Sequence, residues 1–355
     1  MISFIVTTYN LEDRLLHRCL SSIVSQGLAR DEYEIIVVDD ESTVPPRHVV
    51  EAYAHQAHIA LYEQRHARQG AARNLALSHA KGQWVQFVDG DDYLFPHTIA
   101  PLLRSAEDND LDLLMFTFRQ VHEDAEGNIS KGNSSEENIS KENSSENNCQ
   151  LSLVNCQLNC PLSIVPCQLK IVSGDSYMHR HNLFGSCCMQ MFRRHLLDNP
   201  QHGAPLRFTE GIYIEDEEFV THLVWRAQRM ARVDVPVYAY YQRAGSTVHS
   251  RSREHTDELF RNSFAVLGRL LQFESSLAAV PHAGVTRKVR FLAVDILRRS
   301  LREPDWQERW HQSAHQLGSL GLYPIPPATY SLKYTIFRLL AQSRLGRQVL
   351  HAFEK

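Results

Sequence analysis

Three clusters of polar residues follow apolar runs in the first 92 residues, at Thr7-Thr8-Tyr9-Asn10, Asp39-Asp40-Glu41-Ser42 and Asp89-Gly90-Asp91-Asp92. In the third cluster, two carboxylates separated by one small residue can hold a hard divalent cation and leave coordination sites open for phosphate oxygens. Asp and Gly also form ordinary turns, and any one cluster alone fits that explanation. The three together favour a site for a cation and an anionic ligand.

Two further motifs carry charged residues at the start of predicted helices. Gly70-Ala71-Ala72-Arg73-Asn74 places a guanidinium where an anionic ligand would bind, although a solvated helix face is the alternative. Glu215-Asp216-Glu217-Glu218-Phe219 offers a candidate general base, or an ordinary acidic helix start. A helix N-terminus favours ionised carboxylates and neighbouring acids favour protonated ones, so the pattern leaves the protonation state open.

Alternating strands and helices must position these residues. The hydrophobic periodicity predicts strands over residues 2–8, 34–39, 59–63, 84–89 and 112–118, and helices over 12–26, 46–55, 70–80 and 98–106. This alternation indicates an α/β fold with a mostly parallel, doubly wound sheet. In such sheets ligands bind beyond the carboxyl ends of the strands, which is where the polar clusters fall.

The second half of the chain has a different pattern. A helix over residues 215–229 leads into a strand over 232–241, and helices follow over 259–277, 285–301 and 306–317. Residues 330–354 read as one basic amphipathic helix, for which packing on the domain and attachment to a membrane surface are equal alternatives.

Residues 126–172 are repetitive. The ten residues from Asn128 recur from Asn138, and a second short repeat carries Cys149, Cys156, Cys160 and Cys167. The cysteine spacings do not match those of structural zinc sites. We interpret the segment as a duplicated insertion in a surface loop, with a metal-binding cysteine cluster as the less favoured alternative.

Composition limits the broad class of the protein. The chain has 355 residues, of which 43% are hydrophobic and 22% charged, with a net charge of −4. These values are typical of a globular protein and argue against a general nucleic-acid binder. The sequence has no leader pattern and no apolar run long enough to span a bilayer, so we expect a cytoplasmic protein with reduced thiols.

The order and spacing of the motifs over residues 1–118 closely resemble the family 2 glycosyltransferases of GT-A fold. The matching runs are Phe4 to Asn10, Cys19 to Ile23 with Gln26, Glu34 to Ser42, Gly70 to Asn74 and Phe87 to Asp92. The resemblance implies a Rossmann-like GT-A sheet flanked by helices, and inverting transfer of a sugar from a nucleoside-diphosphate donor. It also implies Mg²⁺ or Mn²⁺ at the Asp-x-Asp motif.

The same resemblance assigns donor-side roles to individual residues. Thr8, Tyr9 and Asp39 would lie at the nucleoside, with Asp39 accepting the base N–H, and Arg73 would lie beside the nucleotide. Asp89 and Gly90 would contact the nucleotide-sugar, with Asp89 near the ribose and the metal. Asp91 would be the direct metal ligand.

On the acceptor side, the resemblance implies a base that deprotonates the acceptor hydroxyl. We assign Asp216 as this base and Glu215 as a supporting or substitute carboxylate. Tyr238 to Arg243 are similar to an aromatic strand and loop of the family, in which Arg243 and His249 would meet the diphosphate when the loop closes.

These assignments predict four segments and a function. Residues 1–125 form the nucleotide-sugar half of the GT-A domain, 126–172 the insertion, 173–255 the acceptor half and 256–355 a helical C-terminal region. The expected donor is a UDP-linked hexose or N-acetylhexosamine, and the expected acceptor is a cell-surface glycan or its lipid-linked form. Peripheral contact with the cytoplasmic face of the membrane would run through residues 330–355.

Two alternative functions stay open from the sequence. A nucleotidyltransferase would carry a Gly-rich phosphate loop with a basic residue after the first strand, which Thr8-Tyr9-Asn10-Leu11-Glu12 lacks. A non-catalytic nucleotide- or glycan-binding module would need no intact carboxylates at Asp89, Asp91, Glu215 and Asp216. A dinucleotide oxidoreductase is excluded by the missing G-x-G-x-x-G.

Overall fold

The computed structural model describes residues 1–123, 129–131, 168–242, 252–277 and 282–354. The chain packs into two compact units. The sheet unit contains Met1–Gly174 and Phe184–Arg251, and the helical unit contains Asp175–Leu183 and Ser252–Lys355. The predicted insertion falls largely outside the described residues, and so do its four cysteines.

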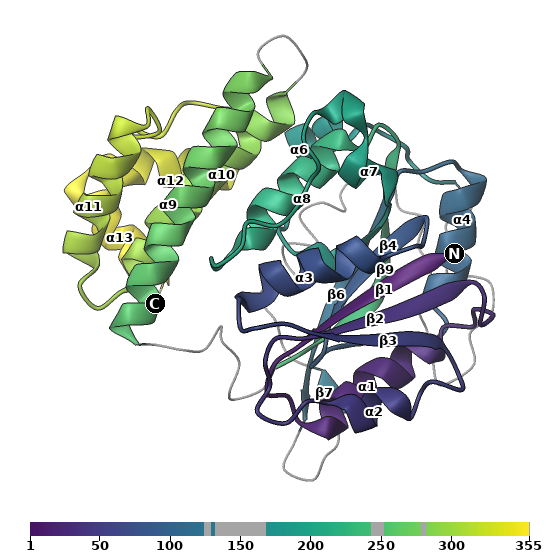
Figure 1. Cartoon of the computed structure of the whole chain (residues 1–355). Coiled ribbons are helices and arrows are strands. Elements are labelled where there is room, and N and C mark those ends of the chain that lie inside the picture. The colour runs from purple at the N-terminus through teal and green to yellow at the C-terminus, as the bar shows by residue number, and fades with distance from the viewer. Residues whose placement is uncertain (124–128, 132–167, 243–251, 278–281, 355) are drawn as a thin grey trace. The chain divides into compact units, whose positions relative to one another are not determined.

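The sheet unit is built on one mixed sheet (Figure 1). Its described strands run in the order β3 (His58–Glu63), β2 (Tyr33–Asp39), β1 (Ile2–Thr8), β4 (Trp84–Asp89), β8 (Gln190–Arg193), β6 (Leu113–Glu123), β9 (Met230–Tyr241) and β5 (Tyr93–Leu94), with β7 (Ile129–Lys131) beside β6. Only β5, β7 and β8 oppose the common direction of the described strands. The sheet is therefore mostly parallel, as predicted.

The strand register brings the predicted polar clusters to one edge. Strand β1 is buried along its whole length, and apart from Ser3 its residues are apolar or β-branched, as is typical of a strand covered on both faces. Thr8 pairs with Asp39 of β2, and Thr7 pairs with Asp89 of β4. The three clusters therefore meet beyond the same end of the sheet.

Helices cover both faces of the sheet. The chain winds from β1 to β3 through α1 (Asp13–Val24) and α2 (Arg47–Glu51), and then reverses direction through α3 (Arg68–His79) to reach β4. Right-handed crossovers put helices on opposite faces when the winding direction reverses, and Figure 1 shows α3 across the sheet from α1 and α2. Further helices are α4 (Ile99–Asp108), α7 (His195–Asp198) and α8 (Glu215–Arg226).

Several elements differ from the sequence-based predictions. The helix predicted over 46–55 covers only five residues as α2, and α8 ends at Arg226 because Ala227 has extended backbone angles. The short strands β5 and β8 were not predicted, since two and four residues carry too little periodicity to be recognised. Strand β8 nevertheless joins β4 to β6 in the middle of the sheet.

The helical unit contains α9 (Arg253–Ser276), α10 (Ala283–Arg302), α11 (Trp306–Ser319), α12 (Leu332–Ala341) and α13 (Arg344–Glu354), and takes up most of α6 (Gly174–Arg180). Arg287 of α10 donates to the backbone oxygen of His179 and to Asn182, so the segment from Asp175 to Leu183 is tied to this unit. No helix in the described part of the chain has the length and apolar composition needed to cross a bilayer.

The single helix predicted over residues 330–354 is wrong. It is two helices, α12 and α13, separated at Gln342 and Ser343. The Ser343 hydroxyl accepts the backbone N–H of Gly346 at 2.9 Å, so it caps the start of α13 and ends the run of α12.

Candidate active site

The edge between β1 and β2 carries the residues predicted to bind a nucleoside. Asp39 is buried and accepts both the backbone N–H and the hydroxyl of Ser42. Tyr9 is 47% exposed, and its ring lies 4.5 Å from the ring of His66. Thr8 is buried beside them. A fixed acceptor therefore lies close to an exposed aromatic surface, which suits a planar, hydrogen-bonding ligand.

The neighbouring Asp40 has a structural role. Its carboxylate accepts the backbone N–H groups of Ala67 and Arg68, both at 2.9 Å, and the side-chain amide of Gln64. It thereby satisfies donors at the start of α3 and fixes the position of that helix. Asp40 therefore stabilises the local chain turn, which is the alternative explanation given above for a single polar cluster.

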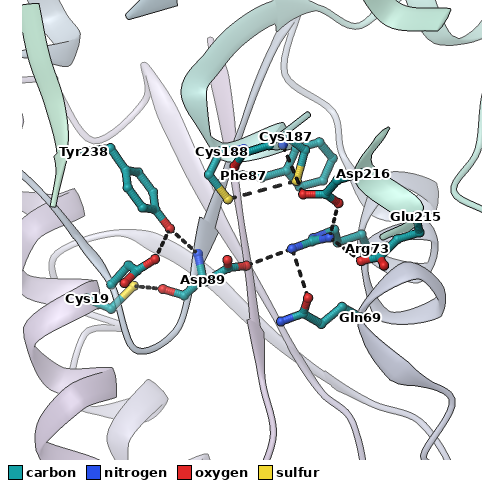
Figure 2. A network of polar contacts seen from close by, with 12 residues as sticks. Cys19, Gln69, Arg73, Phe87, Asp89, Cys187, Cys188, Glu215, Asp216 and Tyr238 are labelled. Atoms are coloured by element: carbon teal, nitrogen blue, oxygen red, sulfur yellow. Dashed lines mark hydrogen bonds and ion pairs between the residues drawn. The ribbon is translucent and has the colours of Figure 1, made fainter. Parts of the chain in front are cut away.

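Arg73 of α3 lies at the centre of a buried ionic cluster (Figure 2). Its side chain is 3% exposed. One terminal nitrogen donates to Glu215 at 2.8 Å and to Asp216 at 2.6 Å, while the other donates to Asp89 at 2.9 Å. We refer to Arg73, Asp89, Glu215 and Asp216 as the arginine cluster. It joins the end of β4 to the start of α8, so the predicted donor motif and the predicted base lie together.

The arginine cluster contains three carboxyl groups and one guanidinium group. Burial raises the pKa of Glu215 to about 7, and the charge of Asp216 adds to this effect. Burial also raises the pKa of Asp216, while the guanidinium of Arg73 opposes the shift. Burial alone would lower the pKa of Arg73, but the carboxylates around it raise it well above its ordinary value. Arg73 therefore stays charged, and Glu215 is a carboxyl that can gain a proton near neutral pH.

A backbone donor fixes the second oxygen of Asp216. The N–H of Cys187, at the start of a 3₁₀ turn over Cys187–Met189, donates to Asp216 Oδ2 at 3.1 Å. Arg73 binds the other oxygen. This contact was not predicted, and the sequence carries no signal for it because the donor is a main-chain group.

The turn after β4 is packed tightly. Gly90 donates its N–H to the Thr7 oxygen at 3.1 Å, and a Cβ atom on residue 90 would lie 2.9 Å from that oxygen. A larger residue would push the turn away from β1. Gly90 therefore lets the two aspartates on either side of it follow the strand closely.

Asp92 anchors this turn to β9. It accepts the Tyr238 hydroxyl at 2.6 Å and the Tyr241 backbone N–H at 2.7 Å, and the Tyr238 oxygen in turn accepts the Asp89 N–H at 3.1 Å. Burial and the charges of Asp91 and Asp89 raise the pKa of Asp92 well above its ordinary value. The roles of Asp92 and Tyr238 were not predicted, because the two residues are 146 positions apart in the sequence and no local pattern links them.

A cavity of about 250 Å³ opens beside this anchor. Asp89, Asp92, Ser186, Cys188 and Tyr238 contribute polar groups to its lining, together with apolar side chains of Phe118, Phe184, Met189 and Tyr240. The cavity therefore offers a small amphipathic space next to Asp89.

The donor set at Asp89 and Asp91 fits a hard divalent cation. Both side chains offer carboxylate oxygens, and their charges already act on buried Asp92, so a cation would relieve repulsion there. Within the residues that the structure describes, no three His, Cys, Asp or Glu side chains form a complete metal site. Arg243 and His249 lie outside the described residues.

The chain is similar to known glycosyltransferases in both sequence and structure. Poly(ribitol-phosphate) beta-glucosyltransferase of Bacillus spizizenii is 33% identical over 124 residues, which are 34% of this chain and 19% of that protein. The crystal structure of S. aureus TarS 1–349 in complex with UDP-GlcNAc matches with a TM-score of 0.64 at 20% identity, covering 99% of this chain and 88% of that one. A mannosyltransferase from Pyrobaculum calidifontis, in complex with GDP-Man and Mn²⁺, matches with a TM-score of 0.51 at 16% identity, covering 99% and 84%.

The structural matches confirm the predicted fold, a mostly parallel sheet flanked by helices with a helical C-terminal region. The chain spans about a fifth of the length of the Bacillus spizizenii relative. Residues 3–199, more than half of the chain, match the family model described as glycosyl transferase family 2. The chain therefore belongs to glycosyl transferase family 2.

Proposed function

We propose that the chain transfers a sugar, with inversion, from a UDP-linked hexose or N-acetylhexosamine to a hydroxyl of a growing cell-surface glycan of polysaccharide, lipopolysaccharide or O-antigen type. The observation that carries the proposal is the arginine cluster, in which Arg73 connects Asp89 with Glu215 and Asp216. The UDP-GlcNAc complex of TarS and the poly(ribitol-phosphate) relative support the choice of donor and acceptor class.

On the donor side, Asp39 accepts the N–H of the base and Tyr9 contacts the nucleoside. Asp89 and Asp91 would hold Mg²⁺ or Mn²⁺, and the Mn²⁺ complex of the mannosyltransferase of similar fold supports this assignment. When bound, the ion supplies positive charge that stabilises the departing diphosphate. Gly90 keeps the motif close to β1, which places both carboxylates at the strand end.

On the acceptor side, Asp216 removes the proton from the attacking hydroxyl. Arg73 and the Cys187 N–H hold its two oxygens in a fixed orientation toward the acceptor hydroxyl. Arg73 opposes the effect of burial on the pKa of Asp216, and so favours the ionised form that a base requires. The hydroxyl attacks from the face opposite the leaving group, so no covalent enzyme intermediate forms.

The test is a screen of nucleotide-sugars by thermal shift with Mn²⁺, followed by turnover with the donor that binds. A ligand that binds only the native state raises the melting temperature. Asp216→Asn should remove turnover and retain the thermal shift. Glu218→Gln is the matched control, because Glu218 lies in the same turn of α8 and its carboxylate accepts the Thr209 hydroxyl outside the arginine cluster.

Two results would contradict the proposal. If none of the nucleotide-sugars shifts the melting temperature, the donor assignment is wrong. If Asp216→Asn turns over at nearly the rate of the parent chain, Asp216 is not the base.

A further inference from the structure

The last two helices each bury one apolar face and expose another. In α12, Tyr334, Phe337 and Ala341 are buried. On the opposite side of the same helix, Leu332, Ile336 and Leu339 are 75%, 46% and 56% exposed. The spacing of three and four residues aligns these three side chains along a single stripe.

Helix α13 repeats this arrangement. Gly346 and Leu350 are buried, whereas Leu345, Val349 and Phe353 are 72%, 37% and 83% exposed. Six of the eleven large hydrophobic side chains that are exposed in the described chain therefore belong to α12 and α13. We call these six residues the apolar stripe.

The charge around the apolar stripe indicates which surface it binds. Residues 331–354 contain Lys333, Arg338, Arg344 and Arg347 and one acid, in a chain whose net charge is −4. The acid, Glu354, is 12% exposed and forms ion pairs with Arg298 at 2.5 Å and Arg302 at 2.7 Å. Lys333 and Arg344 are exposed to solvent and follow or precede stripe residues Leu332 and Leu345 directly in the chain, so the exposed charges beside the stripe are positive. Arg347 contacts the helical unit instead, because it donates to the Ala341 backbone oxygen and its guanidinium lies 6.0 Å from the Trp310 ring.

We propose that α12 and α13 form a binding surface for an anionic lipid bilayer, with the apolar stripe inserted at the level of the headgroups. An apolar face bordered by Lys and Arg gains from burial in the interface and from attraction to anionic lipids. Contact between two copies of this surface would bring like charges together, which disfavours self-association. The proposal is independent of the donor and acceptor assigned above.

The experiment is co-sedimentation of the whole chain with vesicles of phosphatidylcholine, either alone or with about one third phosphatidylglycerol. We expect binding to the anionic vesicles, and weaker binding at about 0.5 M salt than at about 0.1 M. The double variant Leu345→Gln, Phe353→Gln should lower the partition coefficient roughly tenfold or more. Both side chains are mostly exposed, so the variant should fold normally.

Matched controls distinguish insertion of the apolar stripe from non-specific adsorption of the protein to vesicles. Val44→Gln removes a side chain that is 73% exposed in the sheet unit, and it should leave vesicle binding unchanged. Lys333→Gln with Arg344→Gln should weaken binding to anionic vesicles, whereas Lys81→Gln in the sheet unit should not. A nucleotide-sugar thermal shift measured on each variant should be unchanged, so failure here is distinguishable from failure of the proposed function.

Three outcomes would overturn the proposal. One is no co-sedimentation with anionic vesicles, and another is equal binding by the Leu345→Gln, Phe353→Gln variant and the parent chain. The third comes from light scattering without lipid. If the parent chain is an oligomer that this double variant converts to a monomer while vesicle binding is unchanged, the apolar stripe is a self-association surface.

Discussion

Replacement of Arg73 by methionine tests whether one guanidinium holds the two halves of the site together. The Arg73 side chain is 3% exposed, and its contacts with the cluster carboxylates are 2.6–2.9 Å long. Removal of one partner from a buried ion pair costs about 3–5 kcal/mol, because the remaining charge stays buried. We expect Arg73→Met to lower the free energy of unfolding by about this amount near neutral pH.

The cost should depend on pH. A carboxyl whose pKa is raised by folding contributes stability that is fully present below its unfolded pKa and is lost as pH rises through its folded pKa. Burial raises the pKa values of Glu215 and Asp216, and Arg73 lowers both, so the variant raises them further. The stability difference between the parent chain and Arg73→Met should therefore be smallest near pH 5 and grow toward about pH 8.

The assay is urea unfolding followed by tryptophan fluorescence over this pH range. Gln26→Met is the matched control, since Gln26 is also buried but is uncharged and donates to the backbone oxygens of Ser22 and Phe95. Its loss should cost stability by a similar amount at every pH. If the cost of Arg73→Met is as independent of pH as that of Gln26→Met, Arg73 acts through packing and the electrostatic argument fails.

Three further predictions concern single residues of the site. Asp91→Ala should abolish metal-dependent donor binding, and calorimetry with donor and Mn²⁺ that gives unchanged affinity would refute its role as a ligand. Glu215→Gln removes a carboxyl whose pKa is about 7. As the pH rises from about 5 to 8, the variant should therefore gain up to roughly 3 kcal/mol of unfolding free energy relative to the parent chain. Curves of unfolding free energy against pH that run parallel for the two proteins would contradict this. Tyr238→Phe leaves buried Asp92 without a hydroxyl donor, which should cost about 1–3 kcal/mol in urea unfolding, and a loss well below that range would show that the hydroxyl is dispensable.

Much of the fold, and the meeting of the polar clusters at one edge of the sheet, could be predicted because the signals are local. The buried strands are read from continuous apolar runs, and parallel pairing places their carboxyl ends at one edge. The pairing of Thr8 with Asp39 and of Thr7 with Asp89 confirms that step. The exceptions also have local causes, since β8 is too short to show periodicity and a single serine divides the last helical segment.

The sequence by itself determined which residues could do the chemistry and which strand ends carry them. Only the tertiary structure decided their partners. Arg73 and Glu215 are 142 residues apart, and nothing in either local pattern states that one guanidinium faces Glu215, Asp216 and Asp89. Similarly, Asp92 resembles its neighbours in sequence, but Tyr238 and Tyr241 bury it as an anchor. Burial and long-range pairing control the charge and hydrogen bonding of each carboxylate, and both arise only when distant segments pack together.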